Sequence, residues 1–212
     1  MAMPSALIWG ASGGIGSALV NLLKQKNWTV FGVARDENKI PASANGHFTC
    51  DADDPASFDQ AVSLIARQTD GIDWMVYAIG GIRANLIEKM PIEDWHTTFT
   101  INLHGAFYAT RASLDILNKQ AHLTFLGVYP EKITLPRMSA YTAAKVGLEA
   151  YVNILKKEHR KHIITLARLP AVNTPFWLNV PFKMPDYALS PESVAQSLLM
   201  HYDKDIGEDL NI

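Results

Sequence analysis

Tyr141 and Lys145 have the residue types and the spacing of a proton-transfer pair. They stand four positions apart in Tyr141-Thr-Ala-Ala-Lys145, within a helical pattern, so both side chains are expected on one face of a helix. An ammonium close to a phenol favours the phenolate and lowers the tyrosine pKa from its ordinary value of about 10. Tyr141 could then act as a general acid toward a carbonyl oxygen, or as a general base in reverse. The pair alone also arises by chance, so its meaning depends on the surrounding elements.

A glycine-rich turn near the start of the chain is a second candidate site. The first apolar run leads into Gly10-Ala-Ser-Gly-Gly14-Ile-Gly16, and a helical pattern begins at once. Glycines allow a sharp turn and let a pyrophosphate approach the free N–H groups at the start of the helix. The turn therefore predicts dinucleotide binding, with a glycine turn that holds no ligand as the alternative.

The end of the second predicted strand indicates which dinucleotide is preferred. In Val33-Ala34-Arg35 no acidic residue stands where NAD enzymes hold the ribose 2′-hydroxyl, whereas Arg35 can accommodate a 2′-phosphate. These residues favour NADP. Asp36 could oppose a phosphate, or form a surface ion pair with Arg35. After the third strand, Asp51 is placed to meet an adenine edge.

Short apolar runs alternate with longer helical patterns, which is typical of βαβ units around a parallel sheet. The predicted strands are Ala6–Gly10, Thr29–Ala34, His47–Cys50, Trp74–Ile79, Leu123–Val128, Ile163–Leu169 and Asp209–Ile212. The predicted helices are Ile15–Lys26, Pro55–Gln68, Ile92–Leu117, Ser139–Lys161 and Pro191–Tyr202. We expect one Rossmann-type α/β domain over residues 1–212, with a doubly wound sheet of about seven strands between two helical layers. Ligands of such sheets bind at the carboxyl ends of the strands.

Composition excludes several other classes of function. A net charge of −2 gives no electrostatic reason to expect nucleic acid or an anionic membrane as a partner. Cys50 is the only cysteine, no signal peptide is recognisable, and no apolar run is long enough for a membrane span. The histidines have no metal-ligand spacing with cysteine or carboxylates, so we expect no metal site. A cytoplasmic protein is expected.

Over almost its whole length, the chain resembles the short-chain dehydrogenase/reductase family. The residues that carry the resemblance are the Gly10–Gly16 turn, Asp51, Asn102, Tyr141 with Lys145, and Leu169-Pro-Ala-Val-Asn-Thr174. The resemblance implies that Tyr141 is the acid/base, that Lys145 also holds the nicotinamide ribose, and that Asn102 binds a relay water. Exposure to solvent is the alternative reason for an asparagine at position 102. The implied cofactor-binding residues are Gly10, Ser12, Gly13, Gly14, Ile15, Gly16, Arg35, Asp51, Ala52, Ala78, Gly80, Tyr141, Lys145, Pro170, Val172 and Thr174.

The chain departs from the family pattern where a catalytic serine is expected. That position is Val128, or Gly127 if the loop is one residue longer, and neither residue has a hydroxyl. Loss of one such hydrogen-bond donor lowers kcat by about 10²–10³. Tyr129 is a candidate replacement donor, or else packs the loop, and Ser139 is expected to cap its helix. The family's Asn-Asn-Ala-Gly run appears as Tyr77-Ala-Ile-Gly80, so only its glycine remains.

The leading hypothesis is an NADP(H)-dependent oxidoreductase that reduces a carbonyl, or oxidises an alcohol, on a small and largely apolar substrate. An aromatic and proline-rich loop at about residues 170–190 is expected to cover that substrate, or else to pack against the domain or a neighbouring subunit. Two alternatives remain: an NADP(H)-binding sensor or partner-binding protein without turnover, and redox-neutral chemistry with the same phenol. The resemblance further implies a homodimer or homotetramer.

Overall fold

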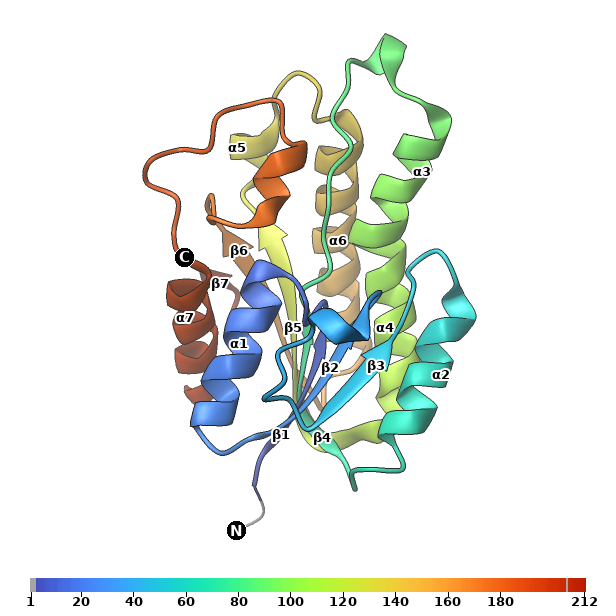
Figure 1. Ribbon diagram of the computed structural model, residues 1–212, viewed down its shortest axis with the longest axis vertical. Coiled ribbons are helices and arrows are strands. Elements are labelled where there is room, and N and C mark those ends of the chain that lie inside the picture. Colours follow the sequence, from blue (N-terminus) through green and yellow to red (C-terminus); the bar gives the residue numbers. More distant parts are fainter. Residues whose placement is uncertain (1–2, 205) are drawn as a thin grey trace.

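The computed structural model describes residues 3–204 and 206–212, and its centre is a seven-stranded parallel sheet (Figure 1). The strand order is β3-β2-β1-β4-β5-β6-β7. The strands are β1 (Ser5–Trp9), β2 (Thr29–Ala34), β3 (Gly46–Thr49), β4 (Ile72–Tyr77), β5 (Leu117–Val128), β6 (Ile163–Leu169) and β7 (Leu210–Asn211). The inner strands are buried on both faces, which explains their continuous apolar runs.

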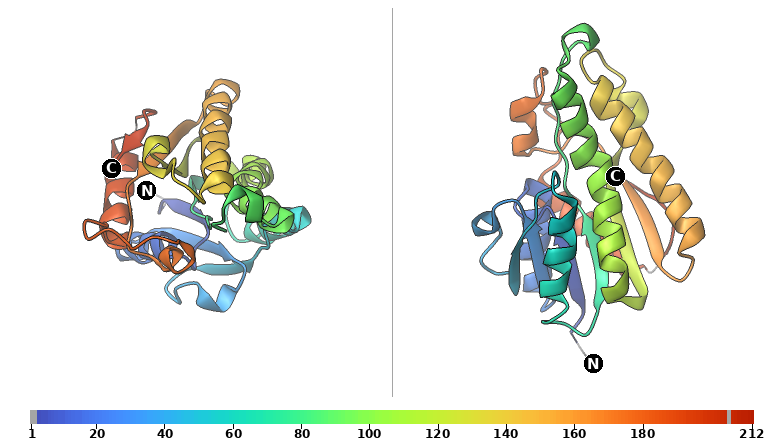
Figure 2. Two further views of the ribbon diagram at one scale, coloured as in Figure 1. Left: turned by 90° about the horizontal axis from the view of Figure 1, so that it is seen from above. Right: turned by 90° about the vertical axis from the view of Figure 1, so that its right-hand side faces the viewer.

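Helices cover both faces of this sheet (Figures 1 and 2). They are α1 (Gly14–Gln25), α2 (Pro55–Ile65), α3 (Ile92–Phe99), α4 (Gly105–Ser113), α5 (Pro130–Ile133), α6 (Ser139–Glu158) and α7 (Pro191–Asp203). Phe58 and Leu148 belong to the core under α2, α4 and α6, while Leu19 and Leu198 belong to the core under α1 and α7. The architecture is the predicted doubly wound α/β sheet. Within the described residues, none of the helices combines the length and the apolar character needed to cross a membrane.

The predicted helix at 92–117 differs most from the structure. It is divided into α3, a π-helical turn at Thr100–His104 and α4, and it ends at Ser113. β5 then begins at Leu117, six residues earlier than predicted. The prediction missed this start because the residues from Asn118 to Gln120 are polar and exposed and do not show the apolar pattern of a buried strand. The π turn has a side-chain partner outside the helix, Tyr77 of β4, which a helical pattern cannot reveal.

The order of the strands reverses beside β1, so the carboxyl ends of β1 and β4 border the crevice where ligands of such sheets bind. The backbones meet there, because Ala78 N–H donates to Trp9 O at 2.8 Å. The segment that follows β6 crosses above the same edge of the sheet, shown in orange in Figure 1. Most of the candidate site residues converge on this crevice, while Arg35 and Asp51 lie farther along the same edge.

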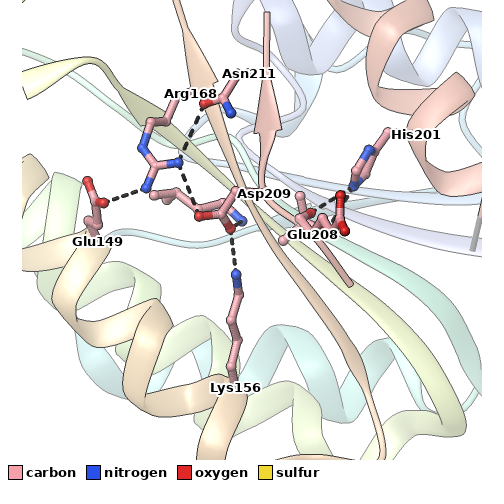
Figure 3. Close-up of polar contacts among 9 residues, drawn as sticks. Glu149, Lys156, Arg168, His201, Glu208, Asp209 and Asn211 are labelled. Carbon is pink, nitrogen blue, oxygen red and sulfur yellow. Dashed lines mark hydrogen bonds and ion pairs between the residues drawn. The ribbon is translucent and has the colours of Figure 1, made fainter. Parts of the chain in front are cut away.

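The short strand β7 is fixed by charged side chains (Figure 3). Arg168 of β6 bonds both Glu149 of α6 and Asp209, and Lys156 of α6 reaches Asp209 as well. Only two residues of β7 pair with β6. The ion pairs therefore help to hold β7 on the sheet, as more backbone hydrogen bonds would do in a longer strand. The same contacts join β7 to the helix that carries Tyr141.

Candidate functional site

The glycine turn between β1 and α1 has the shape of a phosphate cradle. Gly10 has φ +91°, and a Cβ there would lie 2.8 Å from the carbonyl carbon of Ala78. A Cβ at Gly16 would collide with Gly10 O, so the turn can close this tightly only with glycine. Gly13 is the N-cap of α1 and supplies no side-chain cap, which leaves first-turn N–H groups free for an anion. The residues present therefore fit a dinucleotide pyrophosphate.

The other predicted members of the turn lie at or near the surface. Ser12 and Gly13 are exposed, and Gly14 and Ile15 are partly buried. A Cβ at Gly14 would lie 2.6 Å from Cγ2 of Thr174, so Thr174 is brought directly beside the turn. The turn and the segment after β6 thus form one site.

At the carboxyl end of β2, Arg35 is exposed, and the carboxylate of Asp36 is paired with Lys39. The alternative of a surface ion pair between Arg35 and Asp36 is not what the structure shows: Asp36 pairs with Lys39 at 3.2 Å and accepts a hydrogen bond from Asn38 N at 3.2 Å. These hydrogen bonds, that from Lys39 first, lower the pKa of Asp36. Since its charge is balanced by Lys39, Asp36 would oppose a phosphate bound at Arg35 less than a free carboxylate would.

Asp51 and Ala52 follow the carboxyl end of β3. Asp51 is exposed, and its Oδ1 accepts a hydrogen bond from Asp53 N at 3.1 Å, while Ala52 is buried. Asp54 is the residue that caps α2, through Ala56 N. The Asp51 carboxylate therefore remains at the surface of the same sheet edge that carries the glycine turn.

Asn102 lies inside the π turn and is fully buried, which excludes solvent exposure as its reason. Its Nδ2 donates to Gly81 O at 2.7 Å and to Thr98 O at 2.8 Å. A Cβ built on Gly80 would lie 3.5 Å from Asn102 Oδ1 and 3.9 Å from Lys145 Nζ. The asparagine and the lysine therefore border the same point after β4, although 43 positions separate them in the sequence.

Tyr141 and Lys145 lie on the inner face of α6, both 7% exposed. Lys145 Nζ donates to Leu126 O at 2.9 Å and lies 5.9 Å from the centroid of the Tyr141 ring. Burial lowers the pKa of Lys145 to about 8, and burial raises the pKa of Tyr141. The expected lowering of the tyrosine pKa is therefore absent from this arrangement, because the loss of hydration outweighs the neighbouring ammonium.

The surroundings of Tyr141 are apolar. It packs in a small cluster with Ile82 and Met138, to which Ala84, Val128, Ile133, Phe176 and Val180 are added at the edge. The ring of Phe176 lies 5.5 Å from the ring of Tyr141, between centroids. Val128 thus occupies the place where a serine is expected. Among the described residues the Tyr141 hydroxyl has no hydrogen-bond partner, which leaves it available to a substrate oxygen.

Tyr129, the candidate replacement for the serine, has another partner, and Ser139 does not have its predicted place. Tyr129 donates its hydroxyl to Ile212 O at 3.1 Å, and Lys132 Nζ lies over its ring. Ser139 is not the cap of α6 as predicted: Met138 is the N-cap residue, and Ser139 is the first helical residue. Positions two apart do not share a helix face, so Ser139 faces away from Tyr141. Within this conformation neither hydroxyl is placed to replace the missing serine.

The segment after β6 completes the crevice. Val172 is buried and pairs with Leu189, and Trp177 donates its ring N–H to Val172 O at 2.8 Å. Pro170 precedes Val172 and is partly buried. In this way the two ends of the loop at 170–190 are tied together, and Phe176 is held over Tyr141.

Two relevant residues cannot be assigned a role from the sequence. Phe176 belongs to the predicted aromatic loop, but its contact with Tyr141 depends on the fold. Tyr77 stands out in the sequence only as a departure from the family pattern. The structure gives its hydroxyl a partner, Ile101 O at 2.8 Å, within the turn that holds Asn102.

Comparison with known proteins agrees with this geometry. A family model of short chain dehydrogenases matches residues 4–180. The 3-oxoacyl-(acyl-carrier-protein) reductase FabG of Escherichia coli (strain K12) is 30% identical over 169 residues, covering 76% of this chain and 69% of that protein. Fatty acyl-CoA reductase of Acinetobacter baylyi is 29% identical over 214 residues, covering 92% and 71%.

Solved structures share the whole fold. An alcohol dehydrogenase from the archaeon Thermococcus sibiricus, complexed with 5-hydroxy-NADP, matches with a TM-score of 0.90 at 22% identity, covering 100% of this chain and 96% of that one. A putative short-chain oxidoreductase from Thermus thermophilus matches with a TM-score of 0.81 at 27% identity, covering 92% and 94%. The glycine turn, Asn102 and the Tyr141–Lys145 pair all lie within the matched residues 4–180, and the chain belongs to the short-chain dehydrogenase family of oxidoreductases.

Proposed function

We propose that this protein is an NADP(H)-dependent reductase of a carbonyl group on a small, largely apolar substrate. The observation that carries the proposal is the meeting of Tyr141, Lys145 and Asn102 beside the glycine turn, at the carboxyl edge of the sheet. A binding protein needs no buried lysine next to an unpaired phenol. The relatives from Escherichia coli and Acinetobacter baylyi, a 3-oxoacyl reductase and an acyl-CoA reductase by name, support a carbonyl substrate.

Each side chain has a defined task in this proposal. NADPH, when bound, supplies the hydride to the carbonyl carbon. Tyr141 donates the proton of its hydroxyl to the carbonyl oxygen, and the raised pKa of the buried phenol keeps that proton in place at neutral pH. Lys145 holds the nicotinamide ribose, and Asn102 anchors the water through which a proton returns. The apolar cluster around Tyr141 excludes bulk water and favours an apolar substrate.

The preference for NADPH rests on Arg35. Its side chain is exposed at the end of β2, and the adjacent carboxylate of Asp36 is directed to Lys39. A guanidinium can contact a 2′-phosphate through two parallel hydrogen bonds. The remaining cofactor contacts are assigned as predicted from the sequence, including Asp51, Ala78 and Thr174. We further expect a cytoplasmic homodimer or homotetramer in which residues 1–212 act as one dinucleotide-binding domain.

A second function, dinucleotide binding without turnover, is favoured by one observation. Val128 and Phe176 pack against Tyr141 with apolar atoms, and Val128 stands where the family serine is expected. An enzyme with this site would depend on Tyr141 alone to stabilise the developing oxyanion. It would be slower by about 10²–10³ than one that keeps the serine.

Two measurements test the proposal. Titration with NADPH and with NADH, followed by nicotinamide fluorescence, should show tighter binding of NADPH. Arg35→Ala should remove the preference, while Arg67→Ala, at an exposed residue just after α2, should preserve it. A carbonyl substrate panel should then show NADPH oxidation that Tyr141→Phe abolishes and Tyr108→Phe does not. Tight NADPH binding without turnover on any substrate would favour the second function. Undiminished turnover in Tyr141→Phe would refute the mechanism.

A further inference from the structure

The π turn at Thr100–His104 places one extra residue in the helical path between α3 and α4. Gly105 N–H bonds Thr100 O, five residues back, instead of Ile101 O as a regular α-helix requires. Backbone groups in such a turn need partners from outside the regular helical ladder. Two side chains supply them: Asn102 donates to Thr98 O at 2.8 Å, and Tyr77 donates to Ile101 O at 2.8 Å.

Tyr77 and Gly105 fit one another closely. Tyr77, the last residue of β4, is 1% exposed, and its hydroxyl crosses from the sheet to the π turn. A Cβ at Gly105 would collide with that hydroxyl, so the tyrosine can reach Ile101 O only because position 105 has no side chain. Burial raises the pKa of Tyr77, so the hydroxyl remains a donor over the working pH range.

The position of the turn decides where Asn102 points. Its amide is held at Gly81 O at 2.7 Å and borders Gly80 together with Lys145. A shift of the extra residue along the helix would rotate position 102 by about 100° and move the amide away from Gly80. Without the Tyr77 hydroxyl, Ile101 would lose a hydrogen bond that ties it to the sheet and holds the turn in place.

We propose that Tyr77 is a positioning residue: its hydroxyl fixes the π turn in register and thereby holds Asn102 against Gly80 and Lys145. The catalytic consequence rests on the proposed function, because Asn102 matters to turnover only if it serves the proton relay. The positioning itself does not, and it can be measured in the protein alone. The tyrosine that replaces an asparagine of the family pattern thus has a task of its own.

The first test is hydrogen exchange of the Asn102 side-chain amide, followed by NMR in the protein without cofactor. Tyr77→Phe keeps the ring and removes the hydroxyl, and should accelerate this exchange at least about tenfold, the equivalent of one lost hydrogen bond. Tyr108→Phe, a partly buried tyrosine of α4, is the matched control and should leave the exchange unchanged. Unchanged exchange in Tyr77→Phe would overturn the inference, whatever happens to activity.

The second test is a double-mutant cycle on kcat. Tyr77→Phe should lower kcat by about tenfold with little change in the KM for NADPH, and should have no further effect in the Asn102→Ala background. Additive losses would show that Tyr77 acts only on general stability and would overturn the inference. Full turnover in Asn102→Ala would instead remove the relay from the proposed function, and the exchange measurement would still decide whether Tyr77 positions Asn102.

Discussion

Replacing Lys145 with methionine should make the pH dependence of stability change in a calculable way. The lysine is 7% exposed, and burial lowers its pKa from 10.5 to about 8. The unfolded chain therefore binds more protons than the folded protein between these two values, and the stability of the wild type rises with pH across that window. At about pH 7 the buried ammonium costs about 3 kcal/mol, and at about pH 9.5 the cost falls to about 1 kcal/mol.

Methionine has a similar length and no charge, so this pH-dependent cost is absent from Lys145→Met. The variant also loses the hydrogen bond to Leu126 O, but that loss of about 1 kcal/mol does not change with pH in this way. We expect the wild type to gain about 2 kcal/mol relative to the variant between about pH 7 and pH 9.5. The assay is urea unfolding followed by tryptophan fluorescence, with Lys119→Met, at an exposed position of β5, as the control for losing one positive charge. An equal difference at both pH values would refute the reasoning and show that Lys145 has an ordinary pKa.

Three further changes have defined outcomes. Gly105→Ala should destabilise the protein by about 1–3 kcal/mol in urea unfolding, and part of that loss should be recovered in the Tyr77→Phe background; no recovery would mean that the two residues are not in contact. Burial alone would raise the pKa of Asp209, but hydrogen bonds, chiefly from Lys156, lower it overall. Asp209→Asn should therefore cost about 2 kcal/mol at neutral pH, and the cost should shrink as the pH falls below about 3.8; a thermal-unfolding difference independent of pH would contradict this. Phe176→Ala should admit water to Tyr141 and lower its pKa, seen as an earlier phenolate transition in ultraviolet titration; an unchanged transition would show that Phe176 does not shield it.

Much of the fold follows from patterns that are local in the sequence. The buried strands are recognisable as apolar runs, and the turn at Gly10–Gly16 lies between β1 and α1 as predicted. The π turn could not be predicted, because one of the side chains that support it, Tyr77, comes from β4 and meets the turn only in the fold. A helical pattern shows which face of the helix is apolar. It does not reveal the extra residue of a π turn when the same face stays buried.

The pKa values of Tyr141 and Lys145 were harder to predict than the helix face that these side chains share. The spacing of Tyr141 and Lys145 indicates that they share a face, and α6 presents both inward. Spacing does not show how far that face is buried from water. Burial in the apolar cluster raises the pKa of Tyr141, whereas the neighbouring lysine was expected to lower it. The hydrogen-bond partner of Tyr129 could not be predicted either. Ile212 O lies 83 positions away in the sequence and meets Tyr129 only through the arrangement of the last strand.

The contact of Gly14 with Thr174 has a consequence for the order of events during synthesis. A chain emerging from the ribosome exposes the glycine turn well before Thr174 and Pro191, yet both residues belong to the surroundings of the turn. β1 also lacks its second neighbouring strand until β4 has been synthesised. A nascent chain would therefore carry an unfinished cradle until Thr174 and Pro191 have been synthesised. Retention on an immobilised dinucleotide would then select molecules in which the segment after β6 has already docked.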